Sequence, residues 1–511
     1  MTADAQSISP NQRLLITIVL MAATLMVVLD TTIANVALPH MQTALSASPD
    51  NVTWVLTSYM LANAVALPLT GYFSNRLGRR TMLTLAIMGF TASSAVCGVA
   101  TSLPVMVLAR VAQGFFGASL VPLSQAVMYD INPPEKIVQA MTIWGLVIMV
   151  GPISGPVLGG WITDNFDWRW VFFINLPIGL AAGAGSWLLL PRVKPSGVKF
   201  DMFGFMLLAV ALSSMQIMLD RGVEQDWFNS IEIWCELAIM IASLWMFVVH
   251  TVTARETVLP RALFKDRNFV IAVCVSTVMG GIMSASSALL PPMLQRLMGY
   301  SVYDAGLLTA PRGAAVMAGM LVAGRITKYI DTRALIMCGM VLLAYSLSMM
   351  SGFSLAIDRA PIIVSSLWQG AALGLVVMPM NLMALSTLPP NVRTEAASLY
   401  NLSRTLGGSI AISISTTLLS NNTQISHSDL AAHISQTRIP ILNSGMAEQF
   451  GFRGTDALQL MNNEVTRQAV MVAYIDNYWL MMWAAIAVVP LVILIRPKKS
   501  AKPDVGVVDA H

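Results

Sequence analysis

The sequence predicts an all-α protein that crosses a membrane fourteen times, and three observations carry this prediction. Only 11% of the 511 residues are charged and 56% are hydrophobic, whereas about 25% of an ordinary soluble domain is charged. Apolar runs of 18 or more residues recur along the whole chain, and about 20 such residues span a bilayer as a helix. Lysine and arginine concentrate in alternate loops, as they do when those loops face the cytoplasm.

Most of the predicted spans are joined by short loops. The long exception is residues 421–477, which are polar, rich in Asn, Gln and Ser, and include amphipathic pieces. This segment is either a docking surface for a partner or simply a long loop on the outer side. The predicted spans are 14–38, 52–73, 81–99, 104–127, 138–161, 170–190, 202–219, 233–253, 269–294, 304–326, 334–353, 361–385, 397–420 and 478–495.

The placement of basic residues tests this count independently. With both termini in the cytoplasm, the inner loops hold 20 of the 30 Lys and Arg residues and the outer loops hold seven. Arg110, Arg312 and Arg404 lie within predicted spans. A shift of the frame by one span would destroy this bias, so the positive-inside rule supports fourteen spans.

An internal repeat divides the chain. Parallel six-span halves are a known plan of transporters, and the repeat predicts such halves at 1–195 and 261–511 around a two-span insert at 196–260. The second half includes the outer loop 421–477 and a cytoplasmic tail, 496–511. Landmarks of the first half recur 256 residues later: Gln113-Gly114, Pro133-Pro134 and Gly151 match Gln369-Gly370, Pro389-Pro390 and Gly407, while Gly71 matches Gly324 at a spacing of 253.

Asp30 is the only charge in the first span. A carboxylate there costs about 2.5–3.5 kcal/mol on insertion scales, which makes it a functional candidate. It follows Arg13 by 17 residues, or about 25 Å of helix, and Arg110 lies at a matching depth in the outer half of the membrane. The two residues are either a fixed ion pair that locks two spans together or a switch. In the second case, a proton on Asp30 weakens the pair and couples a proton gradient to a conformational cycle.

Two further motifs are candidates for moving parts. The loop between spans 2 and 3 is either a membrane anchor or a latch between the halves; its glycines permit a tight turn. The fifth span is rich in Gly and Pro, which suits either close static packing or a sliding surface. The loop residues are Gly71, Asn75, Arg76, Gly78, Arg79 and Arg80, and the fifth-span residues are Gly145, Gly151, Pro152, Gly155, Pro156, Gly159 and Gly160.

Asn35, Gln113, Arg312 and Asn381 are candidates for a polar substrate cavity, although amides within spans also serve as interhelical hydrogen-bond partners. Arg404 is expected to extend to the inner headgroups. Arg312, beside Pro311 and Gly313, is the better candidate for facing the cavity, with pairing to backbone carbonyls as the alternative. Some of the 35 methionines are expected to line an adaptable pocket.

No metal site, cofactor or enzyme activity is predicted. The four cysteines form no CxxC or Cys/His cluster, and no nucleophile–base pair or phosphate-binding loop has credible spacing. The net charge of +4 comes from scattered basic residues, which argues against binding to nucleic acid.

The Gly71–Arg80 loop, Arg110 with Gln113-Gly114, and the fifth-span motif resemble the major facilitator superfamily. The Asp30 segment and the span count narrow the resemblance to its 14-span drug:proton antiporters, and the two-span insert resembles the EmrB type of exporter. The loop departs from the usual pattern at Asn75, where the superfamily has Asp, and this weakens a charge-relay role.

The resemblance implies export of diverse hydrophobic or amphipathic compounds across the inner membrane in exchange for protons. It also implies a periplasmic adaptor protein and an outer-membrane channel as partners. A proton-coupled carrier of one metabolite or siderophore is the alternative on the same fold.

Overall fold

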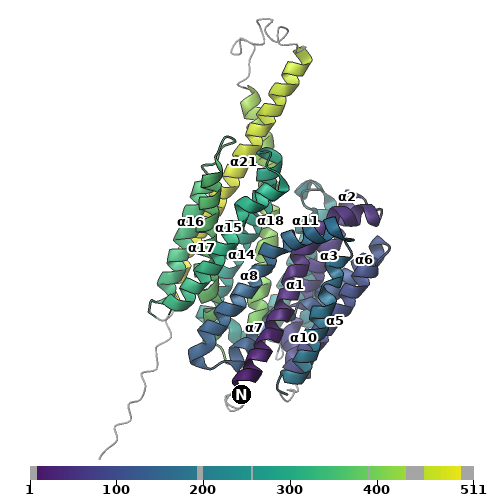
Figure 1. Cartoon of the computed structure of the whole chain (residues 1–511), viewed down its shortest axis with the longest axis vertical. Coiled ribbons are helices and arrows are strands. Elements are labelled where there is room, and N and C mark those ends of the chain that lie inside the picture. Colours follow the sequence, from purple (N-terminus) through teal and green to yellow (C-terminus); the bar gives the residue numbers. More distant parts are fainter. Residues whose placement is uncertain are drawn as a thin grey trace, which may run out of the picture.

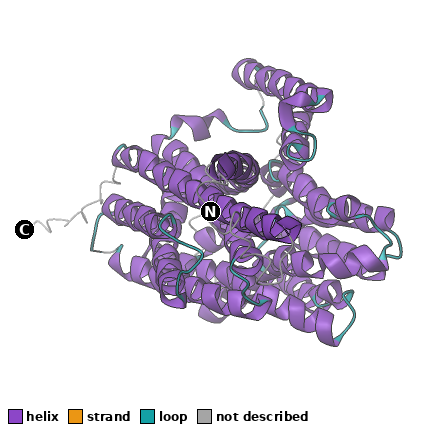
Figure 2. Cartoon of the chain, turned by 90° about the horizontal axis from the view of Figure 1, so that it is seen from above, coloured by secondary structure: helices purple, strands orange, loops and turns teal. Residues whose placement is uncertain are grey.

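Every predicted span is occupied by one helix or by two consecutive helices in the computed structural model. The structure describes residues 9–192, 200–254, 257–327, 329–389, 392–432 and 454–495. Figure 2 shows that these parts are helices joined by loops, with no strand. Eleven of the described helical segments are long and apolar enough to cross a membrane, and helices within 54–77, 134–165 and 393–432 occupy the three remaining predicted spans.

The first half contains ten helices among the described residues, and their boundaries follow local sequence signals. Ser9 caps the first helix by accepting a hydrogen bond from the Gln12 N–H, and Pro68 separates two helices within the second span because it has no N–H to donate. The helices are α1 (Pro10–Ala44), α2 (Pro49–Val52), α3 (Trp54–Ala66), α4 (Leu69–Leu77), α5 (Arg79–Val99), α6 (Leu103–Gly117), α7 (Leu120–Ile131), α8 (Pro134–Asn165), α9 (Trp170–Phe173) and α10 (Asn175–Leu189).

The insert and the second half follow. The insert packs its apolar side against both halves, through a cluster that includes Ala64, Leu208, Phe247 and Leu402. The helices are α11 (Met202–Arg221), η1 (Trp227–Asn229), α12 (Ile231–Thr253), α13 (Arg261–Lys265), α14 (Arg267–Pro292), η2 (Met293–Leu297), α15 (Val302–Ile326), α16 (Thr332–Met350), α17 (Arg359–Ser386), α18 (Arg393–Ala432) and α21 (Gly454–Ile493).

The repeat is visible as equivalent helix packing in the two halves. A Cβ added to Gly114 would lie 2.4 Å from the Tyr59 carbonyl oxygen, and one added to Gly370 would lie 2.1 Å from the Arg312 carbonyl oxygen. Only glycine therefore permits the contact of α6 with α3 and that of α17 with α15. Arg312 thus occupies, in the second half, the position that Tyr59 holds in the first.

The segment 421–477 differs from the expected loop. α18 continues to Ala432 and α21 begins at Gly454, so both helices extend beyond the membrane, and Figure 1 shows α21 rising past the other helices. The Asn422 amide donates to Asp476 (2.9 Å), and His427 lies 3.1 Å from Asn462. These polar pairs join the extensions, which hydropathy alone does not reveal. The remainder of the segment, 433–453, and the tail 496–511 lie outside the described residues.

Candidate functional site

Asp30 lies in α1 with a side chain that is 1% exposed. Arg110 Nη1 donates to its Oδ2 at 2.6 Å, and Gln113 Nε2 and Asn175 Nδ2 donate to its Oδ1 at 2.8 and 3.0 Å. The donors come from α6 and α10, so one carboxylate connects three helices. An ionised carboxylate is acceptor-only, and these donors compensate for its loss of water.

Arg110 is held by more than its counter-ion. Its Nε donates to the Val55 carbonyl at 3.0 Å, and its Nη1 also donates to Gln113 Oε1 at 2.8 Å. The guanidinium carbon lies 4.3 Å from the centroid of the Tyr59 ring, a distance suited to a cation–π contact. These neutral contacts remain available to the guanidinium when the carboxylate takes up a proton.

Further polar groups orient Asn175, one of the donors to Asp30. Asn175 Nδ2 also donates to Ser94 Oγ at 3.0 Å, and Ser94 Oγ donates to the Phe172 carbonyl at 2.8 Å. Sequence reasoning assigned no site role to Asn175 or Ser94. The available signal was the position of Asn175 within the sixth predicted span, because an amide inside a membrane requires hydrogen-bond partners.

The segment 71–80 was predicted as a loop, but it is helical in α4 and at the start of α5, and only Gly78 lies outside a helix. This segment contacts the second half directly. Asn75 Nδ2 donates to Glu395 Oε1 at 2.6 Å. A Cβ on Gly71 would lie 2.3 Å from Glu395 Cγ, so α4 and the start of α18 touch closely. Gly78 has a φ of 82°, in the left-handed region that glycine adopts without strain.

The three arginines of this segment contact different partners. Arg79 forms an ion pair with Asp130 at the end of α7, and Arg393 of the second half pairs with the same carboxylate at 2.5 Å. Arg76 donates to the Tyr72 hydroxyl at 2.5 Å, and the Arg80 guanidinium lies 4.4 Å from the centroid of the Trp187 ring. Arg79 therefore reaches the junction between the halves, whereas Arg76 and Arg80 contact residues of their own half.

Three more hydrogen bonds join the halves near the same side. Asn401 Nδ2 donates to Gln125 Oε1 at 3.2 Å, and Gln125 Nε2 donates to Asn381 Oδ1 at 3.4 Å. The Ser398 hydroxyl donates to the Leu67 carbonyl at the break between α3 and α4. Together with the bonds of Asn75 and Arg393, they form the cytoplasmic joint, which holds the two halves together at the inner side.

The fifth-span motif brings α8 against the helix that carries Asp30. A Cβ on Gly151 would lie 2.4 Å from Val28 Cγ1, and one on Gly155 would lie 2.0 Å from Thr32 Oγ1. Gly159 continues this face, where its Cβ would lie 3.3 Å from Ile33 Cγ2, closer than an ordinary contact, whereas a Cβ on Gly160 meets nothing within 4 Å. The side chains of Pro152 and Pro156 lie outside the described part of the structure.

The opposite part of α8 contacts the second half. A Cβ on Gly145 would lie 3.2 Å from Met320 Sδ, and one on Gly324 would lie 2.5 Å from Thr142 Oγ1. α8 therefore packs on α1 within its own half and on α15 across the molecule. This geometry provides a mechanical connection between the Asp30 site and the other half.

The four polar residues considered for a substrate cavity do not gather in one place. Gln113 belongs to the Asp30 network, and Asn381 belongs to the cytoplasmic joint. The Asn35 amide donates to Thr31 of its own helix at 3.1 Å, and Arg312 holds the position equivalent to Tyr59. Sequence position gave their depth but not the direction in which each side chain points.

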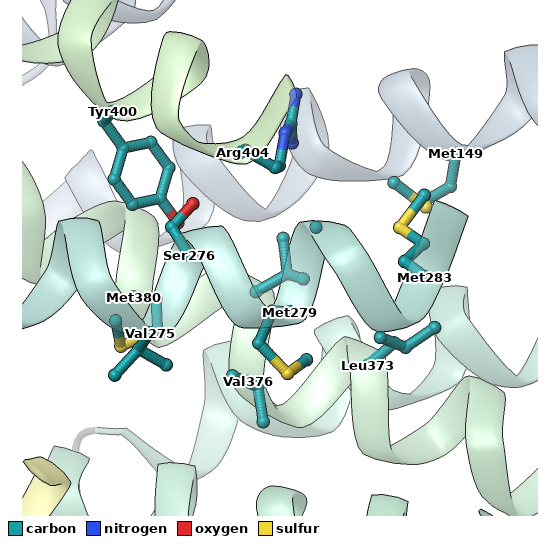
Figure 3. Close-up of a pocket in the computed structure, with 12 residues that line it drawn as sticks. Met149, Val275, Ser276, Met279, Met283, Leu373, Val376, Met380, Tyr400 and Arg404 are labelled. Carbon is teal, nitrogen blue, oxygen red and sulfur yellow. The ribbon is translucent and has the colours of Figure 1, made fainter. Parts of the chain in front are cut away.

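The structure contains a cavity elsewhere, among α8, α14, α17 and α18. It is small, with room for about one water molecule, and its lining is mostly Met and Val. Figure 3 shows Arg404 at this cavity, with Tyr400 and Ser276 to one side and Met149 and Met283 to the other. The expectation that Arg404 extends to the inner headgroups is therefore wrong, because this residue lines the cavity.

Comparison with known proteins agrees with this architecture. A family model described as Major Facilitator Superfamily matches residues 20–412. The proton:xylose symporter XylE, a solved structure, superposes with a TM-score of 0.61 over 95% of this chain and 96% of its own, at 16% sequence identity. This likeness concerns the fold alone.

Two curated relatives match nearly the whole chain. The probable multidrug resistance protein EmrY of Escherichia coli (strain K12) is 36% identical over 492 residues, which are 95% of this chain and 96% of EmrY. The multidrug export protein EmrB of Haemophilus influenzae is 35% identical over 498 residues, which are 96% of each chain. The chain therefore belongs to the Major Facilitator Superfamily and, within it, to the group of EmrB-type proteins.

Proposed function

We propose that this protein is a proton-coupled multidrug exporter that moves hydrophobic and amphipathic compounds across the inner membrane by alternating access. The observation that carries the proposal is the buried Asp30 carboxylate with its Arg110 counter-ion. The family membership supports the export of drugs, as does the similarity to EmrY, a probable multidrug resistance protein, and to EmrB, a multidrug export protein. Protons serve as the coupling ion in this proposal, and no other cofactor is needed.

Protonation of Asp30 is the proposed coupling event. A neutral carboxyl group loses the charge-assisted part of its bond to Arg110, which is about twice as strong as a neutral hydrogen bond. The guanidinium keeps the Val55 carbonyl, Gln113 Oε1 and the Tyr59 ring as partners. Protonation neutralises Asp30, whereas Arg110 keeps both its charge and its neutral partners. The equilibrium between two arrangements of α1, α6 and α10 therefore shifts.

The shift reaches the other half through α8. Val28 and Thr32 of α1 lie against Gly151 and Gly155, and Met320 of α15 lies near Gly145. A small movement of α1 therefore displaces α8 and changes the contact between the halves. For a drug to enter from the cytoplasm, the cytoplasmic joint must open.

We also propose that the extended ends of α18 and α21 contact a periplasmic adaptor protein, which connects the exporter to an outer-membrane channel. The extension lies on the outer side, and it carries exposed apolar side chains, including Ile425 and Leu460, which are 59% and 53% exposed. Apolar groups exposed beyond the lipid favour a protein partner.

The direct test of export uses purified protein in proteoliposomes with an imposed pH gradient and several fluorescent compounds of unrelated structure. We expect gradient-dependent transport of several of them and loss of transport when an ionophore collapses the gradient. Transport of a single compound would favour the specific carrier instead. Transport that ignores the gradient would contradict proton coupling.

A further inference from the structure

Asn175, the first residue of α10, connects the Asp30 carboxylate to the short helix α9. Asn175 is 1% exposed, and its Nδ2 donates to Asp30 Oδ1 and to Ser94 Oγ, each at 3.0 Å. The Ser94 hydroxyl, also buried, donates its own hydrogen to the Phe172 carbonyl at 2.8 Å. A chain of three hydrogen bonds therefore runs from Asp30 to the backbone of α9.

Chemistry fixes the direction of each bond while Asp30 is ionised. A carboxylate can only accept. The Ser94 hydroxyl has a single hydrogen, which the Phe172 carbonyl takes, so toward Asn175 it can only accept as well. Both neighbours of the amide therefore require a donor, and Nδ2 supplies both hydrogens. Among the described residues, none donates to Asn175 Oδ1, so this oxygen is available.

Close packing keeps the amide in place. A Cβ on Gly179, about one turn after Asn175, would lie 1.9 Å from Thr91 Oγ1 of α5. A Cβ on Gly98 of α5 would lie 2.4 Å from Phe173 Cε1 of α9. Both α9 and α10 thus lie against α5 with no room for a further side-chain atom. The Asn175 amide can turn about its Cβ–Cγ bond, but the helix cannot withdraw it.

A proton on Asp30 changes what its neighbours must supply. The neutral carboxyl group has a hydrogen that requires an acceptor when it is buried. Gln113 Oε1 and the Val55 carbonyl already accept from Arg110, at 2.8 and 3.0 Å. Asn175 Oδ1 is the free acceptor. A half-turn of the amide brings this oxygen to the place of Nδ2, and Asp30 then donates to it.

We propose that Asn175 is a positioning residue that transmits the protonation state of Asp30 to α9 through Ser94. After the half-turn, the amide presents its oxygen to Ser94 instead of a hydrogen. The Ser94 hydrogen turns toward this oxygen, and the Phe172 carbonyl loses its donor. Helix α9 is therefore held when Asp30 is ionised and released when Asp30 is protonated. The inference rests on the proposed coupling role of Asp30 and specifies how that site is regulated.

Helix α9 covers the outer side of the Asp30 site, so its release has a consequence there. The Phe172 ring is 5.8 Å from the Arg110 guanidinium carbon, and Phe172 packs in one cluster with Leu29 and Ile33 of α1. The bond from Ser94 ties this cover to α5. Its loss loosens the cover on the outer side, from which the coupling proton comes in the proposed cycle.

The titratable groups that interact with Asp30 are Arg110 of α6, Tyr59 of α3 and Cys97 of α5. These types ordinarily ionise above about pH 8. Helices α9 and α10 have no titratable side chain, and α7 and α8 carry theirs near their ends, at Tyr129, Asp130, Glu135, Lys136 and Asp164. Exposed groups at the outer side titrate at lower pH, so Asp30→Asn is needed to isolate the effect of Asp30; they are His40, Asp164 and Asp167.

The test is hydrogen exchange of the backbone amides of α9 in purified protein in lipid nanodiscs, from about pH 8 down to about pH 4. The amides of Phe172, Phe173 and Ile174 donate within this segment, and their protection is corrected for intrinsic exchange. We expect protection to fall about three- to tenfold on acidification, as for the loss of one neutral hydrogen bond. Protection that stays constant with pH, or rises on acidification, would overturn the inference.

Variants should fix α9 in opposite states. Asn175→Leu has a similar volume but neither donates nor accepts, so Ser94 should hold the Phe172 carbonyl and keep protection high at every pH. Ser94→Ala removes the tie and should keep protection low at every pH. Asp30→Asn, whose amide can donate as the neutral carboxyl does, should also keep it low.

A high plateau in Asn175→Leu cannot come from general loosening of the structure, and Ser94→Ala keeps the test decisive if Asn175→Leu fails to fold. Ser93→Ala is the matched control, because Ser93 donates to Gly89 of its own helix at 2.8 Å and its loss should retain the wild-type pH response. A wild-type response in folded Asn175→Leu or Ser94→Ala would refute the relay. Because exchange needs no gradient, a failed relay with intact gradient-driven efflux would leave the proposed function standing.

Discussion

At the scale of single residues, Asp30 and Arg110 form a buried pair of charges, and neutral hydrogen-bond partners compensate both groups. Both side chains are 1% exposed, and neutral groups from three helices surround them. Removal of one partner of a buried ion pair costs about 3–5 kcal/mol, because the other charge remains without compensation. The pair thus contributes to folding as well as to the proposed coupling, and the two roles can be separated by experiment.

Charge reversal distinguishes the contribution of the pair to folding from its contribution to proton coupling. Asp30→Arg alone and Arg110→Asp alone should each lower the melting temperature markedly, since like charges then face each other in a medium of low dielectric constant. The double exchange should recover most of the lost stability but no gradient-driven efflux, because the carboxylate then occupies the position on α6. Recovery of full efflux by the exchange would mean that pairing alone matters, and it would remove the proton-carrying role from the α1 position.

The pairing of Asp30 with Arg110 was expected from the sequence, because helix rise and bilayer thickness convert their residue counts into matching depths, and the structure shows the pair. Asn175 was not assigned to the site, since depth does not tell which way a side chain points around its helix. The same limit applies to the cavity. Methionine and valine are equally suitable for lipid and for a pocket wall, and only the helix packing distinguishes the two environments.

At the scale of helices, α8 is the element that connects the Asp30 site to the second half. Its glycines at 151 and 155 face α1 at distances that admit no side chain. Gly160, one turn or so further along the same helix, faces open space. This contrast within one helix offers a matched control for the role of close packing.

Gly155→Leu should lower both thermal stability and efflux, because its Cβ would collide with Thr32 Oγ1, 2.0 Å away. Overpacking of this kind typically costs about 1–3 kcal/mol. Gly160→Leu in the same helix should leave both properties near the wild-type level. Melting curves and proteoliposome efflux measure the two effects, and equal behaviour of the two variants would argue against a coupling role for the α1–α8 contact.

The cytoplasmic joint is the second element with a specific chemical signature. Glu395 belongs to it, near the cytoplasmic end of α18, and burial raises the pKa of this carboxyl above its usual value. Asn75 donates a hydrogen bond to it where the superfamily pattern has an acid. A neutral amide beside a buried carboxylate stabilises the joint without electrostatic repulsion.

Asn75→Asp should weaken the joint at neutral and higher pH, because two carboxylates at hydrogen-bond distance cannot both ionise without cost. The defect should diminish as the pH falls and the shared site takes up a proton. Glu395→Gln, combined with Asn75→Asp, should restore the joint, because only one of the two groups can then ionise. Cysteine accessibility from the cytoplasmic side reports the opening; a pH-independent effect of Asn75→Asp would show that charge is not the cause.

At the scale of the whole molecule, the chain joins two similar halves, an insert that packs on both of them, and an extension on the outer side. The halves and the insert followed from the repeat and from the distribution of basic residues. The extension did not, because hydropathy identifies only the part of a helix that lies in lipid. Residues 421–432 contain neither Gly nor Pro, and this absence of helix-breaking residues was the signal for a continuing helix.

The proposed adaptor contact of the extension predicts that variants there reduce drug resistance in cells but not efflux in proteoliposomes. Replacement of Ile425 and Leu460 by Ser should reduce drug resistance in cells that supply the adaptor, since it removes exposed apolar contacts,. The same protein should retain its efflux in proteoliposomes, where no adaptor is present. Serine at the exposed polar positions Asn421 and Gln468 serves as the control. Loss of efflux in both settings would instead indicate a structural role.

The most direct measurement of the central claim is gradient-driven efflux by Asp30→Asn in proteoliposomes, beside wild type and Asp164→Asn. Asp164 is an exposed carboxylate at the end of α8, so its replacement controls for the loss of a charge. We expect wild type and Asp164→Asn to export a drug in response to the pH gradient, while Asp30→Asn falls to the rate seen without a gradient. Equal gradient-driven efflux by Asp30→Asn would contradict the account.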